Sequence, residues 1–272
     1  MDRASSWTQL HEWLFAESWH EPLKRFRSTF AFRGIGVAGH PLVTSLARLG
    51  GDYALKEQHL IRNFRKYARR SVISQDSIWN WLALAKHHGL PTRLLDWTFS
   101  PYVALHFATA SLADFDIDGE ILAVDFAQAN RLLPSKLRRL LDAEGSDVFT
   151  AEMLGCAAQS LRELDGLSSD PFLLFLEPPS LDDRIVNQNA LFSLMSTADA
   201  ALDDWLESHR DLHRRIVLPA SLKWEVRDKL DQANITERVL FPGLDGLSAW
   251  LRRYYSEREI AAETQREVTD QG

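Results

Sequence analysis

Two short sequence patterns contain residues that can bind an anion. Arg33 stands directly before Gly34 at the end of a segment in which apolar residues alternate, as they do along a β-strand. A guanidinium can hold phosphate oxygens through two parallel hydrogen bonds, and a glycine lets a backbone approach closely. His88 and Arg93 flank a Gly-Leu-Pro turn, which is rigid enough to hold both side chains in one cleft. His88 can act there as a proton donor.

Structural roles compete with this interpretation. Arg93 and Asp96 can form a buried ion pair that fixes the loop, and Trp97 is expected in the core. Thr98 suits a structural hydrogen bond as well as a site, and His87 is expected to be exposed or to cap a helix. The sequence therefore leaves two roles open for this segment, ligand binding and stabilisation of a loop.

The sequence lacks the residue patterns that several other kinds of functional site require. His59, His87, His88 and His106 do not have a zinc-binding spacing, and a single cysteine, Cys156, allows neither a second thiolate ligand nor an internal disulfide. Cys156 lies in an apolar, helix-like setting, where we expect it to be buried. The chain has neither a glycine-rich phosphate loop ending in Gly-Lys-Ser/Thr nor a Gly-x-Ser-x-Gly elbow. We therefore expect no metal site.

The charge balance argues against nucleic acid as a partner. The chain has 272 residues and a formal net charge of −7, whereas phosphate backbones select an excess of Lys and Arg. Basic clusters at 62–70 and 136–139 are explained by solvated helix faces. No apolar run approaches the ~20 residues that span a bilayer, and the N-terminus does not resemble a signal peptide. We expect a cytoplasmic protein without membrane contact.

Hydrophobic periodicity predicts helices and strands in irregular alternation. Helices are expected at 7–19, 53–70, 77–86, from Ser100-Pro101 onward, 131–142, 221–234 and around 246–251. Strands are expected at 29–34, 94–98, 119–126, 172–177, 190–195 and 213–219. Because no regular βαβ repeat is visible, we predict an α+β fold with a mixed or antiparallel central sheet flanked by helices. We divide the chain into an N-terminal helix (1–24), an α+β domain (25–255) and a polar C-terminal tail (256–272).

A long stretch of the sequence resembles the FRG-domain family, which is named for a Phe-Arg-Gly triplet. The triplet stands here at Phe32-Arg33-Gly34, and the stretch from Lys86 to Ala108 resembles the family pattern over nearly its whole length. The segments 184–192 and 240–247 look similar as well, although Ala190 stands where the pattern usually has glycine. The resemblance covers roughly residues 25–250.

The order of these segments also resembles the ADP-ribosyltransferase fold. That fold has an arginine on a first strand, a Thr/Ser-x-Ser-Pro before a helix, and a late acid or amide on a strand. The matching residues are Arg33, Thr98 with Ser100-Pro101, and Gln188. The resemblance implies NAD as the substrate: Arg33 would hold its ribose or phosphate, Thr98 would support the nicotinamide ribose, and Gln188 would take the place of the acid. Gly34 and Arg93 would contribute to NAD binding, and His88 would contact a ribose hydroxyl.

Gln188 limits the chemistry that this resemblance implies. Breaking the nicotinamide–ribose bond passes through an oxocarbenium-like state, which a neutral amide stabilises less well than a carboxylate does. The alternatives are slow chemistry, another acid such as Glu177, or a site that only binds. Two functions follow: an ADP-ribosyltransferase-like enzyme that modifies an unidentified acceptor, as a toxin or anti-phage effector, or a non-catalytic module that binds a nucleotide or a partner protein.

Overall fold

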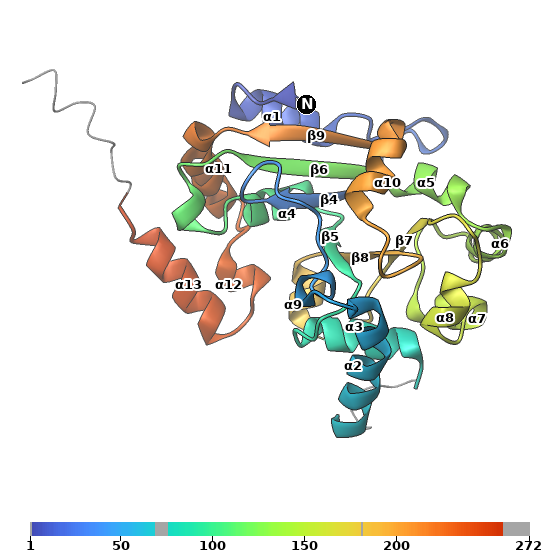
Figure 1. Ribbon diagram of the computed structural model, residues 1–272. Coiled ribbons are helices and arrows are strands. Elements are labelled where there is room, and N and C mark those ends of the chain that lie inside the picture. The colour runs from blue at the N-terminus through green and yellow to red at the C-terminus, as the bar shows by residue number, and fades with distance from the viewer. Residues whose placement is uncertain (1, 69–75, 181, 258–272) are drawn as a thin grey trace, which may run out of the picture.

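A seven-stranded sheet lies at the centre of the molecule (Figure 1). The computed structural model describes residues 2–68, 76–180 and 182–257. The strands follow the order β1-β9-β6-β4-β5-β8-β7, in which β1 runs parallel to β9 and the other neighbours are antiparallel. They are β1 (Asp2–Arg3), β4 (Phe30–Ile35), β5 (Leu95–Thr98), β6 (Gly119–Asp125), β7 (Leu173–Leu176), β8 (Ala190–Met195) and β9 (His213–Leu218), with a separate ribbon of β2 (Trp19–His20) and β3 (Arg25–Phe26). The predicted α+β class with a mixed, mostly antiparallel sheet is confirmed.

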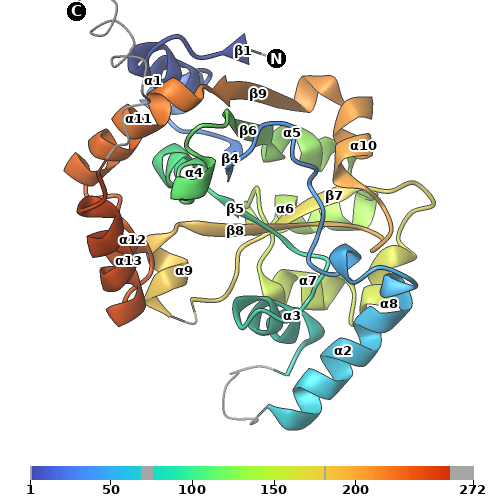
Figure 2. The ribbon, with the colours of Figure 1, turned by 60° about the vertical axis from the view of Figure 1, so that its left-hand side comes forward.

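Helices cover both faces of the sheet and one of its ends (Figure 2). One face of β4, β6 and β9 packs against α1 (Trp7–Phe15), α4 (Pro101–Ala108) and α11 (Ala220–Gln232), and the other against α5 (Phe126–Ala129) and α10 (Leu202–Ser208). The strands β7 and β8 share a core with α2 (Tyr53–Tyr67), α3 (Ile78–His87), α6 (Ser135–Glu144), α7 (Ala151–Ala157) and α8 (Leu161–Asp165). The helix α9 (Asp183–Asn187) lies beside β8, α12 (Glu237–Leu240) contacts α9, and α13 (Leu244–Tyr254) packs against α12. Short 3-10 turns are η1 (Glu21–Leu23), η2 (Ala47–Leu49), η4 (Leu112–Asp114), η5 (Asn130–Leu132) and η6 (Arg210–Leu212).

The alternation of side chains along the strands divides the core. Phe30 and Phe32 of β4 are buried beneath α4 and α11, whereas Ala31 faces the side covered by α10. Trp97 of β5 is buried, as predicted, and its indole Nε1 donates a hydrogen bond to Ser193 Oγ at 2.8 Å. Because side chains alternate along β4, Arg33 lies on the same face as Ala31, whereas its neighbours Phe32 and Gly34 face α4.

The strands β4 and β5 separate soon after they meet. The pairing of β4 with β6 runs from Phe30 to Ile35, but β4 and β5, both fully described, are in register only at Phe32 and Thr98. Beyond this pair the sheet opens between the end of β4 and the start of β5. Residues 33–35 and 95–97 therefore border a gap in the middle of the sheet.

Several sequence-based expectations are refined by the structure. The helix predicted at 131–142 begins at Ser135 instead, because Pro134 holds the preceding residue in an extended conformation. Cys156 is exposed on α7, which corrects the expectation that it is buried. Residues 69–70 of the predicted second helix and 258–272 of the predicted tail lie outside the described residues. Within the expected N-terminal segment, β1 joins the sheet edge and α1 contributes Leu10 and Leu14 to the core.

Candidate functional site

A cavity of about 440 Å³ occupies the place where β4 and β5 separate. Its walls combine aromatic rings with three basic side chains and one acidic side chain. The lining residues are Phe32, Arg33, Gly34, Lys86, His87, Gly89, Asp96, Trp97, Thr98, Phe107, Arg184, Ile185, Gln188, Ala190 and Phe192. Such a mixture of apolar walls and a few convergent polar groups is typical of small-molecule sites. The cavity therefore brings together four of the predicted site residues, namely Arg33, Gly34, Thr98 and Gln188.

Arg33 supplies a cation whose charge is poorly neutralised. Its Nη1 donates a hydrogen bond to the main-chain oxygen of Asp96, and its Nε is buried without a partner among the described residues. Burial lowers the pKa of Arg33; the Asp96 carboxylate opposes this effect, and the positive charge of Arg48 adds to it. The Asp96 carboxylate is itself paired with Lys86 at 2.7 Å. The guanidinium thus keeps donor capacity and charge for a further anion.

Gly34 is required by packing against α4. A Cβ atom at this position would lie 1.8 Å from the main-chain oxygen of Ala104 and 2.7 Å from the amide nitrogen of Ala108. The absent side chain therefore lets β4 lie directly on the backbone of α4. The structure gives Gly34 a role in placing Arg33 and α4, in addition to its position at the edge of the cavity.

Thr98 and Gln188 join the two sides of the cavity to each other. The buried Thr98 Oγ1 donates to the Gln188 carbonyl at 2.7 Å and accepts a hydrogen bond from the amide of Ser100 at 3.0 Å. The Gln188 side chain donates from Nε2 to the carbonyl of Leu240 at 2.9 Å. In this arrangement both side chains already have protein partners.

Gln188 does not lie on a strand, which corrects the sequence-based placement. It follows the last turn of α9, and β8 begins only at Ala190. The Asp182 carboxylate accepts a hydrogen bond from the amide of Ile185 and so caps α9 at its start. Asn189, at φ +48°, then turns the chain into β8. An N-cap signal in front of Gln188 therefore outweighs the strand-like composition of the segment.

His88 was expected in the site, but its neighbour His87 lies there. His88 is exposed at the C-terminal cap of α3 and does not line the cavity. His87 does line it, and its Nε2 lies 2.7 Å from the Asp182 carboxylate. Consecutive residues of a helix point about 100° apart, so one of two adjacent histidines faces the cavity and the other faces solvent.

Arg93 is a structural residue outside this cavity. Its buried guanidinium contacts Glu57 of α2 at 2.6 Å and Asp165 of α8 at 2.7 Å, and it donates to the Ser196 carbonyl at 2.9 Å. The hypothesis of an Arg93–Asp96 ion pair is wrong, because Asp96 pairs with Lys86. Arg93 precedes β5 and turns toward the helices, where its five donors tie three segments together.

Lys86, His87 and Arg184 are the site residues that sequence reasoning missed. Lys86 lies in the last turn of α3, and Arg184 lies in the first turn of α9 with its guanidinium 4.9 Å from the Phe241 ring. Both belong to segments in which the family resemblance had been noticed, and a count of basic side chains there would have found them. Glu177, the alternative acid, follows the end of β7 and does not line the cavity.

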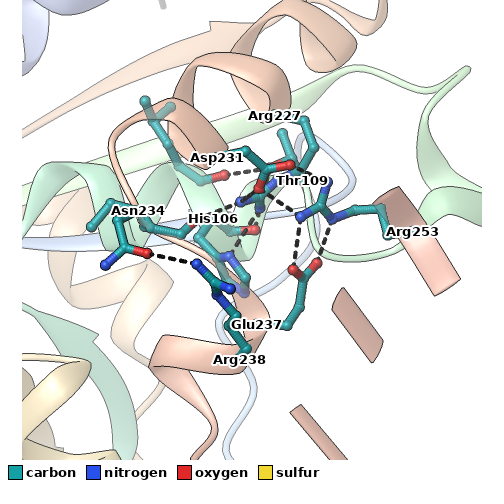
Figure 3. Close-up of polar contacts among 10 residues, drawn as sticks. His106, Thr109, Arg227, Asp231, Asn234, Glu237, Arg238 and Arg253 are labelled. Atoms are coloured by element: carbon teal, nitrogen blue, oxygen red, sulfur yellow. Dashed lines mark hydrogen bonds and ion pairs between the residues drawn. The ribbon is translucent and has the colours of Figure 1, made fainter. Parts of the chain in front are cut away.

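A buried group of charges holds the C-terminal helices beside the cavity (Figure 3). Arg253 of α13 contacts Glu237 of α12 and Asp231 of α11 at 2.6 Å each. Although burial favours the neutral acid, the hydrogen bonds from Arg253 lower the pKa of Glu237 to about 2. Arg227 donates to His106 Nδ1 at 2.9 Å, and burial together with that positive charge lowers the pKa of His106 to about 3. His106 is therefore a neutral acceptor, and the cluster fixes α12, which accepts the Gln188 hydrogen bond.

Two further properties concern the described part of the chain. Within residues 2–68, 76–180 and 182–257, no group of three or more His, Cys, Asp or Glu side chains is arranged to hold a metal ion. Among the helices in these same ranges, none is both long enough and apolar enough to cross a membrane.

Comparison with models of protein families shows that one segment of the chain matches a known domain. A model of the FRG domain matches residues 28–116, which include β4, α2, α3, β5 and α4. Searches of curated proteins and of solved structures found no match. The matched segment contains Arg33, Gly34, Lys86, Asp96 and Thr98 of the cavity, whereas Arg184 and Gln188 come from outside it. The chain thus contains an FRG domain at residues 28–116.

Proposed function

We propose that the cavity between β4 and β5 binds an anionic nucleotide, with NAD as the expected ligand. The observation that carries the proposal is the Arg33 guanidinium, which lines the cavity and whose buried Nε has no hydrogen-bond partner among the residues that the structure describes. A buried cation without a matching carboxylate is costly unless an anion completes it. Lys86 and Arg184 add positive charge to the same walls.

The composition of the walls suits the two parts of such a ligand. Arg33 and Arg184 can donate to pyrophosphate oxygens, because guanidinium groups bind phosphate with two parallel hydrogen bonds. Phe107 and Phe192 offer apolar surfaces for a ring. A volume of about 440 Å³ lies within the range of small-molecule sites. Thr98 and Gln188 shape the wall through their protein hydrogen bonds.

Calorimetric titration of the full chain with NAD tests the binding proposal. Arg33→Gln should weaken NAD binding about tenfold or more, since hydrogen bonds to charged groups contribute about 1.5–3 kcal/mol. Arg62→Gln is the matched control: Arg62 is exposed on α2 and outside the cavity, and its loss changes the net charge equally. Equal affinities of the two variants, or no binding of NAD, ADP-ribose or ADP by the unaltered protein, would refute the proposal.

ADP-ribosyl transfer is a second candidate function. It is favoured by the convergence of Arg33, Thr98 and Gln188, which come from three separate segments in the order that the ADP-ribosyltransferase resemblance implies. In this reaction the bond between the ribose anomeric carbon and the nicotinamide nitrogen breaks, and nicotinamide leaves with the electron pair. An acceptor nucleophile forms the new bond to that carbon and gives up its proton. Asp96 is the acidic residue in the cavity lining, so we assign the stabilisation of the cationic state to Asp96 rather than to Gln188.

Release of nicotinamide from labelled NAD tests this second candidate. Asp96→Asn should abolish release while NAD still binds, and Glu177→Gln, which changes a carboxylate outside the cavity, should leave release unchanged. If the unaltered protein binds NAD but releases no nicotinamide with any acceptor, the site is a non-catalytic nucleotide-binding module. A toxin or anti-phage role would require transfer to a protein acceptor, which labelled NAD in a cell extract would reveal as a labelled band absent with Arg33→Gln.

A further inference from the structure

A second cavity of about 280 Å³ lies next to the first and shares Arg33 and Gly34 with it. It is formed by the end of β4, by the chain that follows, and by the 3-10 turn η2. Its polar lining residues are Arg33, His40, Arg48 and Asp114. Arg33 therefore separates two cavities, and the nucleotide site proposed above occupies the larger one.

Two arginines, Arg33 and Arg48, line this second cavity, and neither forms an ion pair with a carboxylate of the described residues. The positive charge of Arg48 is close enough to lower the pKa of Arg33, although burial is the larger cause. Arg48 is exposed in the last turn of η2, and its side chain makes no hydrogen bond or ion pair with the described residues. The Nε of Arg33 is buried, and it too has no hydrogen-bond partner in the described part of the chain. Like charges held together in this way repel each other unless an anion lies between them.

The negative charge of Asp114, the acidic residue in the lining, is balanced by a lysine behind the cavity wall. Lys223 of α11 is fully buried, and its Nζ donates to the main-chain oxygens of Gly36 at 2.8 Å and Asp114 at 2.6 Å. The Asp114 carboxylate attracts the Lys223 ammonium, which lies behind the same wall. Lys223 thus occupies two acceptor oxygens that border the cavity and balances the Asp114 charge. The two arginines are left as the net charge of this cavity.

We propose that the second cavity binds a phosphoryl group between Arg33 and Arg48, with His40 as a further donor. Guanidinium groups match the oxygens of a phosphate, and a volume of about 280 Å³ suits one or two phosphoryl groups rather than a whole dinucleotide. The group is either part of the nucleotide in the larger cavity or a separate phosphate. The inference shares Arg33 with the proposed function but rests on Arg48, which lies outside the NAD cavity.

Titration with inorganic pyrophosphate tests the proposal in the full chain. The unaltered protein should bind pyrophosphate, and Arg48→Gln should weaken that binding about three- to tenfold, because an exposed charged hydrogen bond contributes about 1 kcal/mol or somewhat more. Arg62→Gln, again the control for net charge, should leave the affinity unchanged. The exposed Arg48 has no hydrogen-bond or ion-pair partner among the described residues, so Arg48→Gln should unfold at the same temperature as the unaltered protein, which would show that the variant is folded.

The same variants separate the two sources of the phosphoryl group. If Arg48→Gln also weakens NAD binding and pyrophosphate competes with NAD, then one ligand spans both cavities. If NAD binding is unchanged and both ligands bind together, the second cavity takes a separate phosphate. Absence of pyrophosphate binding, or equal binding by Arg48→Gln and Arg62→Gln, would overturn the inference while NAD binding could still hold. Conversely, a protein that binds pyrophosphate through Arg48 but never binds NAD would retain the inference and lose the proposed function.

Discussion

Replacement of Gly34 by alanine tests the packing that places Arg33 at the cavity. The new Cβ would lie 1.8 Å from the main-chain oxygen of Ala104, and Cβ atoms essentially never come within 3.0 Å of another atom. The strand β4 and the helix α4 would therefore have to separate by about 1.2 Å. Overpacking costs about 1–3 kcal/mol when side chains can adjust, and here backbone must move, so we expect a loss of about 3 kcal/mol or more. At about 2–4 °C per kcal/mol, the unfolding midpoint should fall by at least about 6 °C.

A glycine two residues further along provides the control. A Cβ atom at Gly36 would meet the Asp114 carboxylate at 3.5 Å, an ordinary contact, and Gly36 does not have a positive φ. Gly36→Ala should therefore leave stability unchanged or raise it by about 0.4–1 kcal/mol. Thermal and urea unfolding of both variants give the comparison. If Gly34→Ala unfolds within about 1 °C of the unaltered protein, the close contact of β4 with α4, and with it the structural account of Gly34, is refuted.

Three further changes test the buried polar contacts. Arg253→Met should cost about 3–5 kcal/mol of unfolding free energy in urea, because it removes the cation that pairs with the buried Glu237 and with the half-buried Asp231. The pKa of His106 is about 3 in the folded protein and 6.5 without perturbation, so on acidification the unfolded chain binds a proton before the folded protein does. The free energy of unfolding should therefore fall as the pH drops from about 6.5 toward 3. His106→Gln should reduce the slope of this pH dependence. The slope should not vanish, because burial also lowers the pKa of His213. Thr98→Val should cost about 1–3 kcal/mol in the same assay by leaving a buried carbonyl and an amide unpaired, and Thr98→Ser should restore most of it.

Local sequence signals predicted most of the fold. Ser100 followed by Pro101 predicted the start of α4, and the Ser100 hydroxyl does accept a hydrogen bond from the amide of Val103. The alternation at 29–34 located β4, which the structure places at Phe30–Ile35. The order of the strands in the sheet could not be read from the chain, because it depends on long-range pairings such as β4 with β6. The separation of β4 from β5 follows from another long-range feature, their pairing at a single position, so the sequence alone could not predict the cavity.

The lining of the cavity was predicted in part, and the two predicted residues that do not line it were misplaced for a common reason. Arg33, Thr98 and Gln188 reach one cavity, as their order in the chain suggested. His88 and Arg93 do not, because adjacent residues of a helix end or a turn face different directions, and composition alone does not tell which neighbour faces inward. His87 faces the cavity in place of His88, while Arg93 satisfies buried carboxylates elsewhere.

The cavity belongs to a larger unit than the segment that matches the FRG domain. The match ends at residue 116, yet the cavity is also lined by later residues, namely Arg184, Ile185, Gln188, Ala190 and Phe192. Gln188 is held by the carbonyl of Leu240, and Arg184 lies over the ring of Phe241, so both depend on the position of α12. That position depends in turn on the ion pairs of Arg253, more than a hundred residues beyond the match. The matched segment supplies Arg33, Lys86 and Asp96, which together carry one net positive charge. Arg184, from the C-terminal half of the chain, supplies the second net positive charge of the lining, and Gln188 from the same half helps to shape the cavity.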